Sequence, residues 1–137
     1  MTMNPELMTP DNVIDRAYEL ISFSAGGNPA WTEFRALFTE PCVLALRVFP
    51  EDPSITVMDL DAYVVHQMRD GLSDEGYSEI PGDRTSTLIG DAAVVNQEFF
   101  IQYKDREPVR AFDGFSLVRI DGVWKIASII SDMITDD

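Results

Sequence analysis

Cysteine and histidine are nearly absent from this sequence. Among 137 residues, Cys42 is the only cysteine and His66 the only histidine. A single cysteine excludes an intrachain disulfide, and with it a secreted scaffold held together by disulfides. One cysteine and one histidine provide no pair of ligands at the spacing of a zinc site, so neither a metal site nor a cofactor is predicted.

Positive charge and long apolar runs are also scarce. The 24 acidic residues outnumber the 10 basic ones and give a formal charge of −14 at pH 7. Such a charge repels the phosphates of nucleic acids and anionic membrane surfaces. No apolar run reaches the length of about 18 residues that suggests a membrane span, and residues 1–10 do not resemble a signal peptide. We therefore expect a cytoplasmic protein that binds neither nucleic acid nor membrane.

The length of the chain suits one domain with a core of its own. We interpret residues 1–10 as a flexible arm and residues 11–137 as a single domain. Within it, helical periodicity predicts a first helix from Pro10 and Asp11. A second helix is expected from near Pro29 to before Pro41, and a third from its N-cap Asp59 to about residue 72.

Strand patterns dominate the rest of the chain. A first strand is expected over residues 42–49. Four more follow over residues 77–88, 93–103, 109–120 and 123–134, the earliest of them interrupted at Pro81-Gly82. Helices followed by a meander of strands predict an α+β fold with the helices on one face of the sheet.

An Asp121-Gly122 turn joins the last two strands. Asp-Gly between apolar runs is typical of a type I′ hairpin, which requires positive φ at both residues. Since opposed residues share a face of the sheet, this turn predicts the register outward along both strands. The predicted pairs are Ile120 with Val123, Arg119 with Trp124, Leu117 with Ile126, Phe115 with Ser128, and Asp113 with Ile130.

Both faces of this predicted hairpin are largely apolar. One carries Phe115, Leu117, Trp124, Ile126 and Ile130, with Asp113 and Asp132 as diagonal neighbours at one end. The other carries Ser116, Val118, Ile120, Val123, Lys125, Ala127, Ile129 and Met133. An antiparallel sheet with one solvated face shows a cleaner alternation than this. We therefore expect the second face to form a homodimer interface through Val118, Ile120, Val123, Ala127 and Ile129.

Three segments carry a resemblance to a known family. They are Phe34-Arg35-Ala36-Leu37-Phe38, the strand entry at residues 90–95 and the hairpin at residues 114–126. Together with the order of elements, they resemble the nuclear transport factor 2-like (NTF2-like) superfamily, in particular its SnoaL-like and DUF4440-like branches. The resemblance implies a cystatin-like cone, in which a strongly curved antiparallel sheet wraps around three N-terminal helices. It also implies an enclosed pocket and, in many members, a homodimer.

Proteins of this shape include isomerases, dehydratases and cyclases, and the resemblance therefore implies a pocket where chemistry could occur. Asp113 and Asp132 are the candidate catalytic residues, because two carboxyl groups close together on an apolar face raise one pKa and allow an acid and a base to coexist. Tyr18 or Tyr63 could supply a phenol donor. The alternative is that both aspartates are solvated at the rim of the sheet, and Glu98 is a further carboxylate whose facing is open.

Aromatic side chains form the candidate ligand-binding wall, although they could equally fill the core. They are Tyr18, Trp31, Phe34, Phe38, Tyr63, Phe99, Phe115 and Trp124. Arg47 stands in an apolar strand and needs either an internal carboxylate or an acidic ligand as partner. His66 lies on the side of its predicted helix away from the apolar stripe, unless the curved sheet reaches it.

Three functions remain open at this stage. The first is a domain that binds a small hydrophobic or aromatic molecule in an apolar pocket. The second is an enzyme of the isomerase, dehydratase or cyclase type that uses an aspartate as general base. The third is a structural or interaction module that binds a partner through its sheet face.

Overall fold

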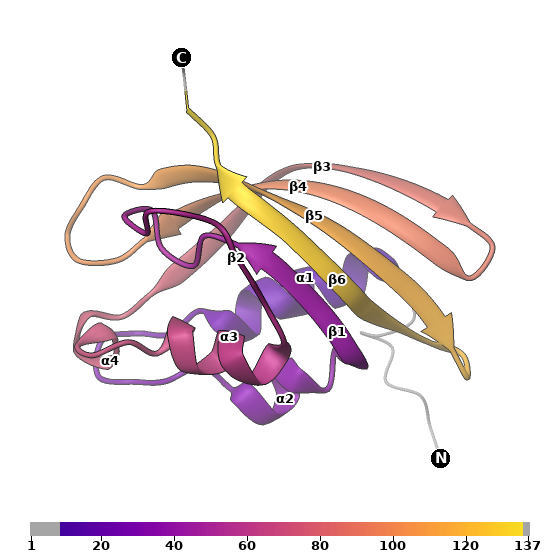
Figure 1. Cartoon of the computed structure of the whole chain (residues 1–137), viewed down its shortest axis with the longest axis horizontal. Helices are drawn as coiled ribbons and strands as arrows, with labels where there is room; N and C mark the ends of the chain where they lie inside the picture. The colour runs from indigo at the N-terminus through magenta and orange to yellow at the C-terminus, as the bar shows by residue number, and fades with distance from the viewer. Residues whose placement is uncertain (1–8, 136–137) are drawn as a thin grey trace.

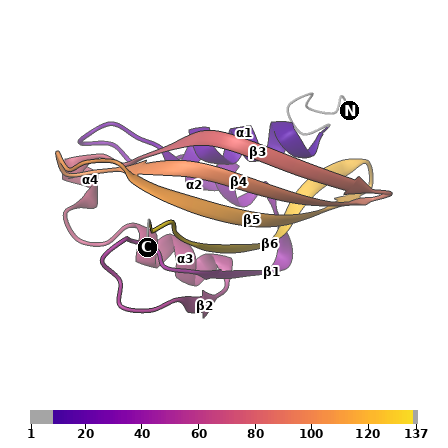
Figure 2. The same ribbon diagram turned by 90° about the horizontal axis from the view of Figure 1, so that it is seen from above.

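A curved six-stranded sheet with helices on one face forms the body of the computed structural model, which describes residues 9–135 (Figure 1). The helices are α1 (Pro10–Ile21), α2 (Trp31–Arg35), α3 (Leu60–Gln67) and α4 (Leu72–Glu75). The strands are β1 (Phe38–Leu46), β2 (Thr56–Met58), β3 (Ser78–Ile89), β4 (Ala92–Gln102), β5 (Val109–Ile120) and β6 (Val123–Met133). Viewed from above, the helices lie behind the strands (Figure 2). The predicted α+β class is confirmed.

The strand order is β2-β1-β6-β5-β4-β3. Every neighbouring pair is antiparallel except β1 and β6, which run parallel. The expected all-antiparallel sheet is therefore wrong at this pair. The long connection from β1 to β6 passes through α3, α4 and the β3–β5 meander, and a connection of that length allows parallel pairing.

Helix α1 begins at Pro10, as the sequence predicts. Thr9 is its N-cap and accepts a hydrogen bond from the amide of Asn12 at 3.1 Å, while Pro10 occupies the first turn. Its apolar stripe, which includes Val13 and Ile14, is fully buried against the sheet. Thr9 and Pro10 therefore belong to the helix rather than to the expected arm. The remainder of that arm lies outside the described residues.

The second and third predicted helices are shorter than expected. Helix α2 ends at Arg35, and Phe38 already begins β1 opposite Ile126 of β6. Pairing with β6 satisfies the backbone of this segment in the sheet, which outweighs its helical periodicity. Asp59 caps α3 as predicted, and its side chain accepts from the amide of Ala62 at 2.8 Å.

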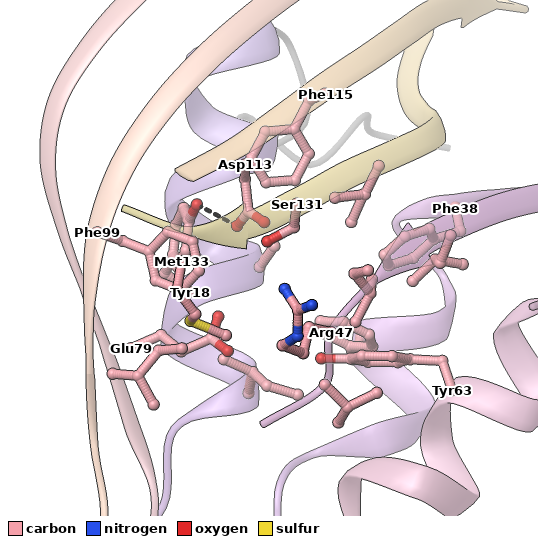
Figure 3. A pocket seen from close by; sticks show the side chains of 18 residues that line it. Tyr18, Phe38, Arg47, Tyr63, Glu79, Phe99, Asp113, Phe115, Ser131 and Met133 are labelled. Atoms are coloured by element: carbon pink, nitrogen blue, oxygen red, sulfur yellow. Dashed lines mark hydrogen bonds between the residues drawn. The ribbon is translucent and has the colours of Figure 1, made fainter. Parts of the chain in front are cut away.

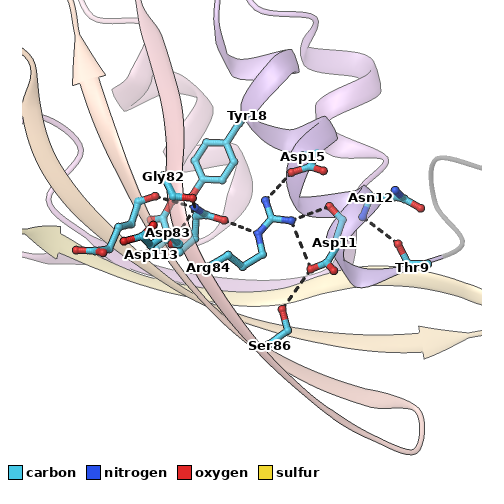
Figure 4. A network of polar contacts seen from close by, with 12 residues as sticks. Thr9, Asp11, Asn12, Asp15, Tyr18, Gly82, Asp83, Arg84, Ser86 and Asp113 are labelled. Carbon is cyan, nitrogen blue, oxygen red and sulfur yellow. Dashed lines mark hydrogen bonds and ion pairs between the residues drawn. The ribbon is translucent and has the colours of Figure 1, made fainter.

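A bulge interrupts β3 between Pro81 and Arg84, as the sequence predicts. The fully buried Gln97 of β4 satisfies the backbone there. Its amide nitrogen donates to the carbonyls of Gly82 at 3.1 Å and Asp83 at 3.2 Å. Its amide oxygen accepts from Arg84 at 2.5 Å, and Arg84 in turn contacts Asp15 of α1 at 2.5 Å (Figure 4). This network ties the first helix to the bulged strand.

The Asp121-Gly122 turn forms as predicted, with φ of 51° and 79°. The predicted register is confirmed from Ile120–Val123 to Leu117–Ile126 and is wrong beyond that point. An extra residue in β6, Ala127, forms a bulge opposite the step from Ser116 to Leu117. The observed pairs after it are Ser116 with Ser128, Phe115 with Ile129, Gly114 with Ile130, Asp113 with Ser131, and Phe112 with Asp132.

The bulge exchanges the faces of the residues that follow it, because side chains alternate along a strand. Ile129, expected on the outer face, turns inward and is only 8% exposed. Ile130 takes the outward position and is 60% exposed. The expected outer face therefore has to be corrected at Ile129 and at Met133, which also lines the cavity, whereas Ile120 lies exposed as expected.

Candidate functional site

A narrow cavity lies between the helices and the concave face of the sheet (Figure 3). Its volume is about 40 Å³, which is room for a few water molecules. Most of its wall is apolar, with a small number of polar groups converging on it. The lining residues are Ala17, Tyr18, Ile21, Phe34, Phe38, Leu44, Leu46, Arg47, Val48, Tyr63, Glu79, Phe99, Ile101, Asp113, Phe115, Ile129, Ser131 and Met133.

Asp113 projects from β5 into this cavity and is 7% exposed. Its carboxylate accepts a hydrogen bond of 2.6 Å from the hydroxyl of Tyr18 on α1, and Ser131 lies beside it on β6. Burial raises the pKa of Asp113 to about 6, and the hydrogen bonds from Tyr18 and Ser131 oppose that rise. Burial and the charge of Asp113 together raise the pKa of Tyr18, whose phenol stays protonated.

Glu79 of β3 is the second cavity carboxyl. The hydroxyl of Tyr77 donates to its Oε2 at 2.5 Å, and its backbone amide donates to Oγ of Ser22 at 3.0 Å. Burial, followed by the negative charge of Asp113, raises the pKa of Glu79 to about 8. Around neutral pH the two cavity carboxyls therefore hold about one proton between them, as expected for coupled acids.

Tyr63 of α3 adds a phenol to the same wall (Figure 3). Its residue is 7% exposed, and its hydroxyl makes no hydrogen bond to another described residue. Burial and then the charges of Glu79 and Asp113 raise its pKa, so the hydroxyl keeps its proton. The cavity thus contains an uncommitted O–H donor.

Asp113 and Asp132 do not form the expected pair. Because of the bulge at Ala127, Asp132 lies opposite Phe112 rather than on the face of Asp113. It binds the guanidinium of Arg47, which lowers its pKa against the effect of burial. The neighbour of Asp113 in the cavity is Glu79.

Six of the eight predicted aromatic residues line the cavity. They are Tyr18, Phe34, Phe38, Tyr63, Phe99 and Phe115. Trp31 lies outside the wall and packs edge-on against Phe34, with ring centroids 5.4 Å apart. Trp124 is a core residue, 2% exposed, and Arg119 lies over its ring. Neither tryptophan lines the cavity.

The two remaining candidates, His66 and Glu98, lie outside the cavity wall. His66 is exposed on α3 and does not line the cavity. Glu98 points to the outer face and pairs with Arg110 at 2.5 Å. Sequence reasoning missed Glu79. The one available signal was a carboxylate two residues after Tyr77 in a predicted strand, since residues two apart on a strand share a face.

Within residues 9–135, no group of histidine, cysteine, aspartate and glutamate side chains could hold a metal ion. The helices of this range are also too short or too polar to cross a membrane. The polar side chains of the cavity wall are two carboxyls, two phenols, one serine hydroxyl and one guanidinium, which exchange protons and form hydrogen bonds.

Solved structures share this architecture. An NTF2-like protein with a cystatin-like fold from Novosphingobium aromaticivorans gives a TM-score of 0.64 at 14% identity, over 91% of this chain and 79% of that one. A candidate dehydratase of the NTF2-like family from Streptomyces avermitilis gives 0.66 at 16% identity, over 93% and 99%. A candidate ketosteroid isomerase from Shewanella frigidimarina gives 0.63 at 18% identity, over 88% and 91%.

In comparisons by sequence, no family model and no curated protein match the chain. TM-scores between 0.63 and 0.66 establish a shared fold despite identities of 14% to 18%, whereas function depends on the site that each fold carries. The resemblance predicted from the sequence is confirmed at that level: the chain has the NTF2-like, cystatin-like fold.

Proposed function

We propose that the protein binds a small, largely apolar molecule in this cavity and transfers a proton on it, with Asp113 as the general base. The observation that carries the proposal is the placement of two carboxyls with separated pKa values, the buried Asp113 and the half-buried Glu79, in one mostly apolar cavity. Pairs of titratable groups whose surroundings separate their pKa values are typical of acid–base sites.

The two carboxyls suit different steps. Asp113, largely ionised at neutral pH, can accept a proton from a carbon next to a carbonyl group. The electron pair of the broken C–H bond then forms the C=C bond of an enol, and negative charge develops on the former carbonyl oxygen. Glu79, protonated at neutral pH, and the free hydroxyl of Tyr63 are donors for that oxygen. In a ketone that carries a C=C bond next to the deprotonated carbon, return of the proton to the far end of that bond would complete an isomerisation.

The walls limit what the site can take. The cavity of about 40 Å³ is much smaller than an ordinary ligand site of roughly 300–1,000 Å³. A ligand with a ring would have to displace Met133, a flexible side chain at the wall (Figure 3). The candidate dehydratase and the candidate ketosteroid isomerase of the same fold support small-molecule chemistry here.

Deuterium exchange tests the proposal without knowledge of the substrate. Small ketones in D₂O are monitored by NMR with the protein present, and the wild type is expected to accelerate exchange next to the carbonyl. Asp113→Asn should lower that acceleration by about 10²-fold or more, whereas Glu98→Gln, on the outer face, should retain it. No acceleration by the wild type, or equal acceleration by Asp113→Asn, would overturn the proposal.

The outer face of the sheet favours a second function, self-association. Apolar side chains lie exposed along it on four strands, although this face carries no described helix (Figures 1 and 2). They are Val43, Val94, Phe100, Ile120 and Ile130. Exposed apolar patches of this kind mark interfaces, and we propose a homodimer through this face.

A further inference from the structure

We propose that Arg47 makes the cavity a site for short-chain carboxylates, with the carboxylate at the guanidinium and the carbon chain directed toward Asp113. The inference rests on the proposed function and names its ligand class. Three features support it: the unused N–H donors of Arg47, the mostly apolar wall around them and the small volume of the cavity.

Arg47 follows the last residue of β1, and its guanidinium points into the cavity (Figure 3). Its Nε donates to the carbonyl of Asp52 at 2.8 Å, and its Nη1 donates to Oδ1 of Asp132. These bonds fix the planar group at its edge. Its Nη2 makes no hydrogen bond to any other described residue, so N–H donors remain for a ligand.

The position of Arg47 suits an anion for a second reason. Among the described residues, Arg47 is the only basic one in the cavity wall, in a chain whose formal charge is −14. Its side chain is 23% exposed, which leaves it partly shielded from water and still reachable from outside. A guanidinium in such a setting binds carboxylates through charge-assisted hydrogen bonds that are stronger than neutral ones.

Asp132 already neutralises part of the positive charge of Arg47, and its negative charge acts on any ligand bound there. Its carboxylate is 46% exposed and binds one edge of the guanidinium. A ligand carboxylate would therefore bind beside Asp132 and be repelled by it. Among the described residues, Asp113 and Glu79 are the other carboxyls in the cavity wall. Removal of the charge on Asp132 should strengthen ligand binding rather than weaken it.

Most of the wall that Arg47 and Asp113 share is apolar. It includes the rings of Phe34, Phe38 and Phe115, which suit a carbon chain, and Ser131 adds one hydroxyl beside Asp113. Since about 40 Å³ holds only a few water molecules, the ligand is a short acid. An acid with a carbonyl next to its carboxylate would place exchangeable hydrogens toward Asp113.

Pyruvate and pyruvamide form a matched pair of probes, because they differ in charge and scarcely in size. Their affinities are measured by NMR titration of the full chain. We expect the wild type to bind pyruvate about tenfold or more tightly than pyruvamide. Arg47→Met should abolish that preference, and Arg119→Met, which removes an exposed guanidinium that contacts Asp91 outside the cavity, should keep it.

Asp132→Asn is a second variant whose expected effect on pyruvate affinity is opposite to that of Arg47→Met. It tests the inference even if Arg47→Met does not fold. It should tighten pyruvate binding severalfold and leave pyruvamide unchanged. Equal binding of the two probes by the wild type, or weaker pyruvate binding by Asp132→Asn, would overturn the inference.

The same titrations separate this inference from the proposed function. If both probes bind equally and exchange still requires Asp113, the proton-transfer role stands and the carboxylate specificity is wrong. If pyruvate binds through Arg47 and Asp113→Asn leaves exchange unchanged, the ligand class stands and the base is wrong. Binding of neither probe by the wild type contradicts the ligand class.

Discussion

The hydroxyl of Tyr18 donates a 2.6 Å hydrogen bond to Oδ2 of Asp113, although 95 positions separate the two residues in the sequence. The bond connects the inner face of α1 with the centre of β5. It also opposes the effect of burial on Asp113, since it favours the ionised form. The helix that closes the cavity therefore also controls the proton affinity of the group inside it.

Removal of the Tyr18 hydroxyl should raise the pKa of Asp113 further. Tyr18→Phe leaves the buried carboxylate without its phenol donor, which also costs about 1–3 kcal/mol of stability. Carboxyl-selective ¹³C NMR titration measures the shift. Tyr103→Phe is the matched control, because that hydroxyl binds Glu51 instead. An unchanged titration of Asp113 in Tyr18→Phe would show that the hydrogen bond does not set its pKa.

The cavity carboxyls should make the folded protein less stable as the pH rises. The pKa values of Asp113 and Glu79 lie at about 6 and about 8 in the folded chain, above their ordinary values of 3.8 and 4.5. The folded state therefore binds more protons than the unfolded state over this interval. This contribution to stability is complete below about pH 4 and is lost as the pH rises through the folded values.

Urea denaturation from about pH 5 to about pH 9 should show a decrease in the free energy of unfolding of the order of a few kcal/mol. Glu79→Gln should flatten the upper part of the profile and Asp113→Asn the lower part. Glu98→Gln, outside the cavity, should keep the slope of the wild type. A profile for Glu79→Gln that runs parallel to the wild type would contradict the assignment.

The outer sheet face should hold two copies of the chain together. We expect light scattering coupled to size exclusion to give the mass of a dimer at micromolar concentration. Ile130→Lys, at a residue 60% exposed on that face, should give a monomer because it places a charge in an apolar interface. Val65→Lys changes an apolar residue of α3 that is 73% exposed and should remain dimeric. A monomeric wild type would exclude the interface.

Gly76 should tolerate no side chain. Its φ is 79°, and an added Cβ would lie 2.8 Å from the backbone nitrogen of Ala25. Gly76→Ala therefore combines backbone strain with a clash. It should lower the free energy of unfolding by at least about 2 kcal/mol more than Gly90→Ala does. Gly90 also has positive φ, yet nothing lies within 4 Å of its Cβ position. Equal thermal stabilities of the two variants would refute the clash.

Local signals were sufficient for several elements. The Asp121-Gly122 turn, the Asp59 cap and the bulge after Pro81 were all predicted, because each depends on residues close together in the sequence. Most of the aromatic wall was predicted for the same reason, since apolar periodicity marks the buried side of a helix or strand. The α+β class follows from the order of these elements.

The pairing of Asp113 with Asp132 was mispredicted because one residue changed the register. Ala127 adds a bulge to β6, so the side chains of β6 from Ser128 onward lie on the face of the sheet opposite to the predicted one. A bulge of this kind lets a sheet curve around its helices, and a hairpin taken alone gives no sign of that curvature. Asp132 consequently pairs with Arg47, while Asp113 has Glu79 as its neighbour in the cavity.

The amino-acid sequence by itself determined the α+β fold class, the turn of the last hairpin and the apolar surfaces that must be buried. These features depend on neighbouring residues and on periodicity. Only the tertiary structure decided which polar groups share the cavity. Tyr18, Glu79 and Asp113 come from α1, β3 and β5, and Arg47 follows β1. Their meeting depends on sheet curvature and strand register, which arise from the packing of the whole chain rather than from any one segment.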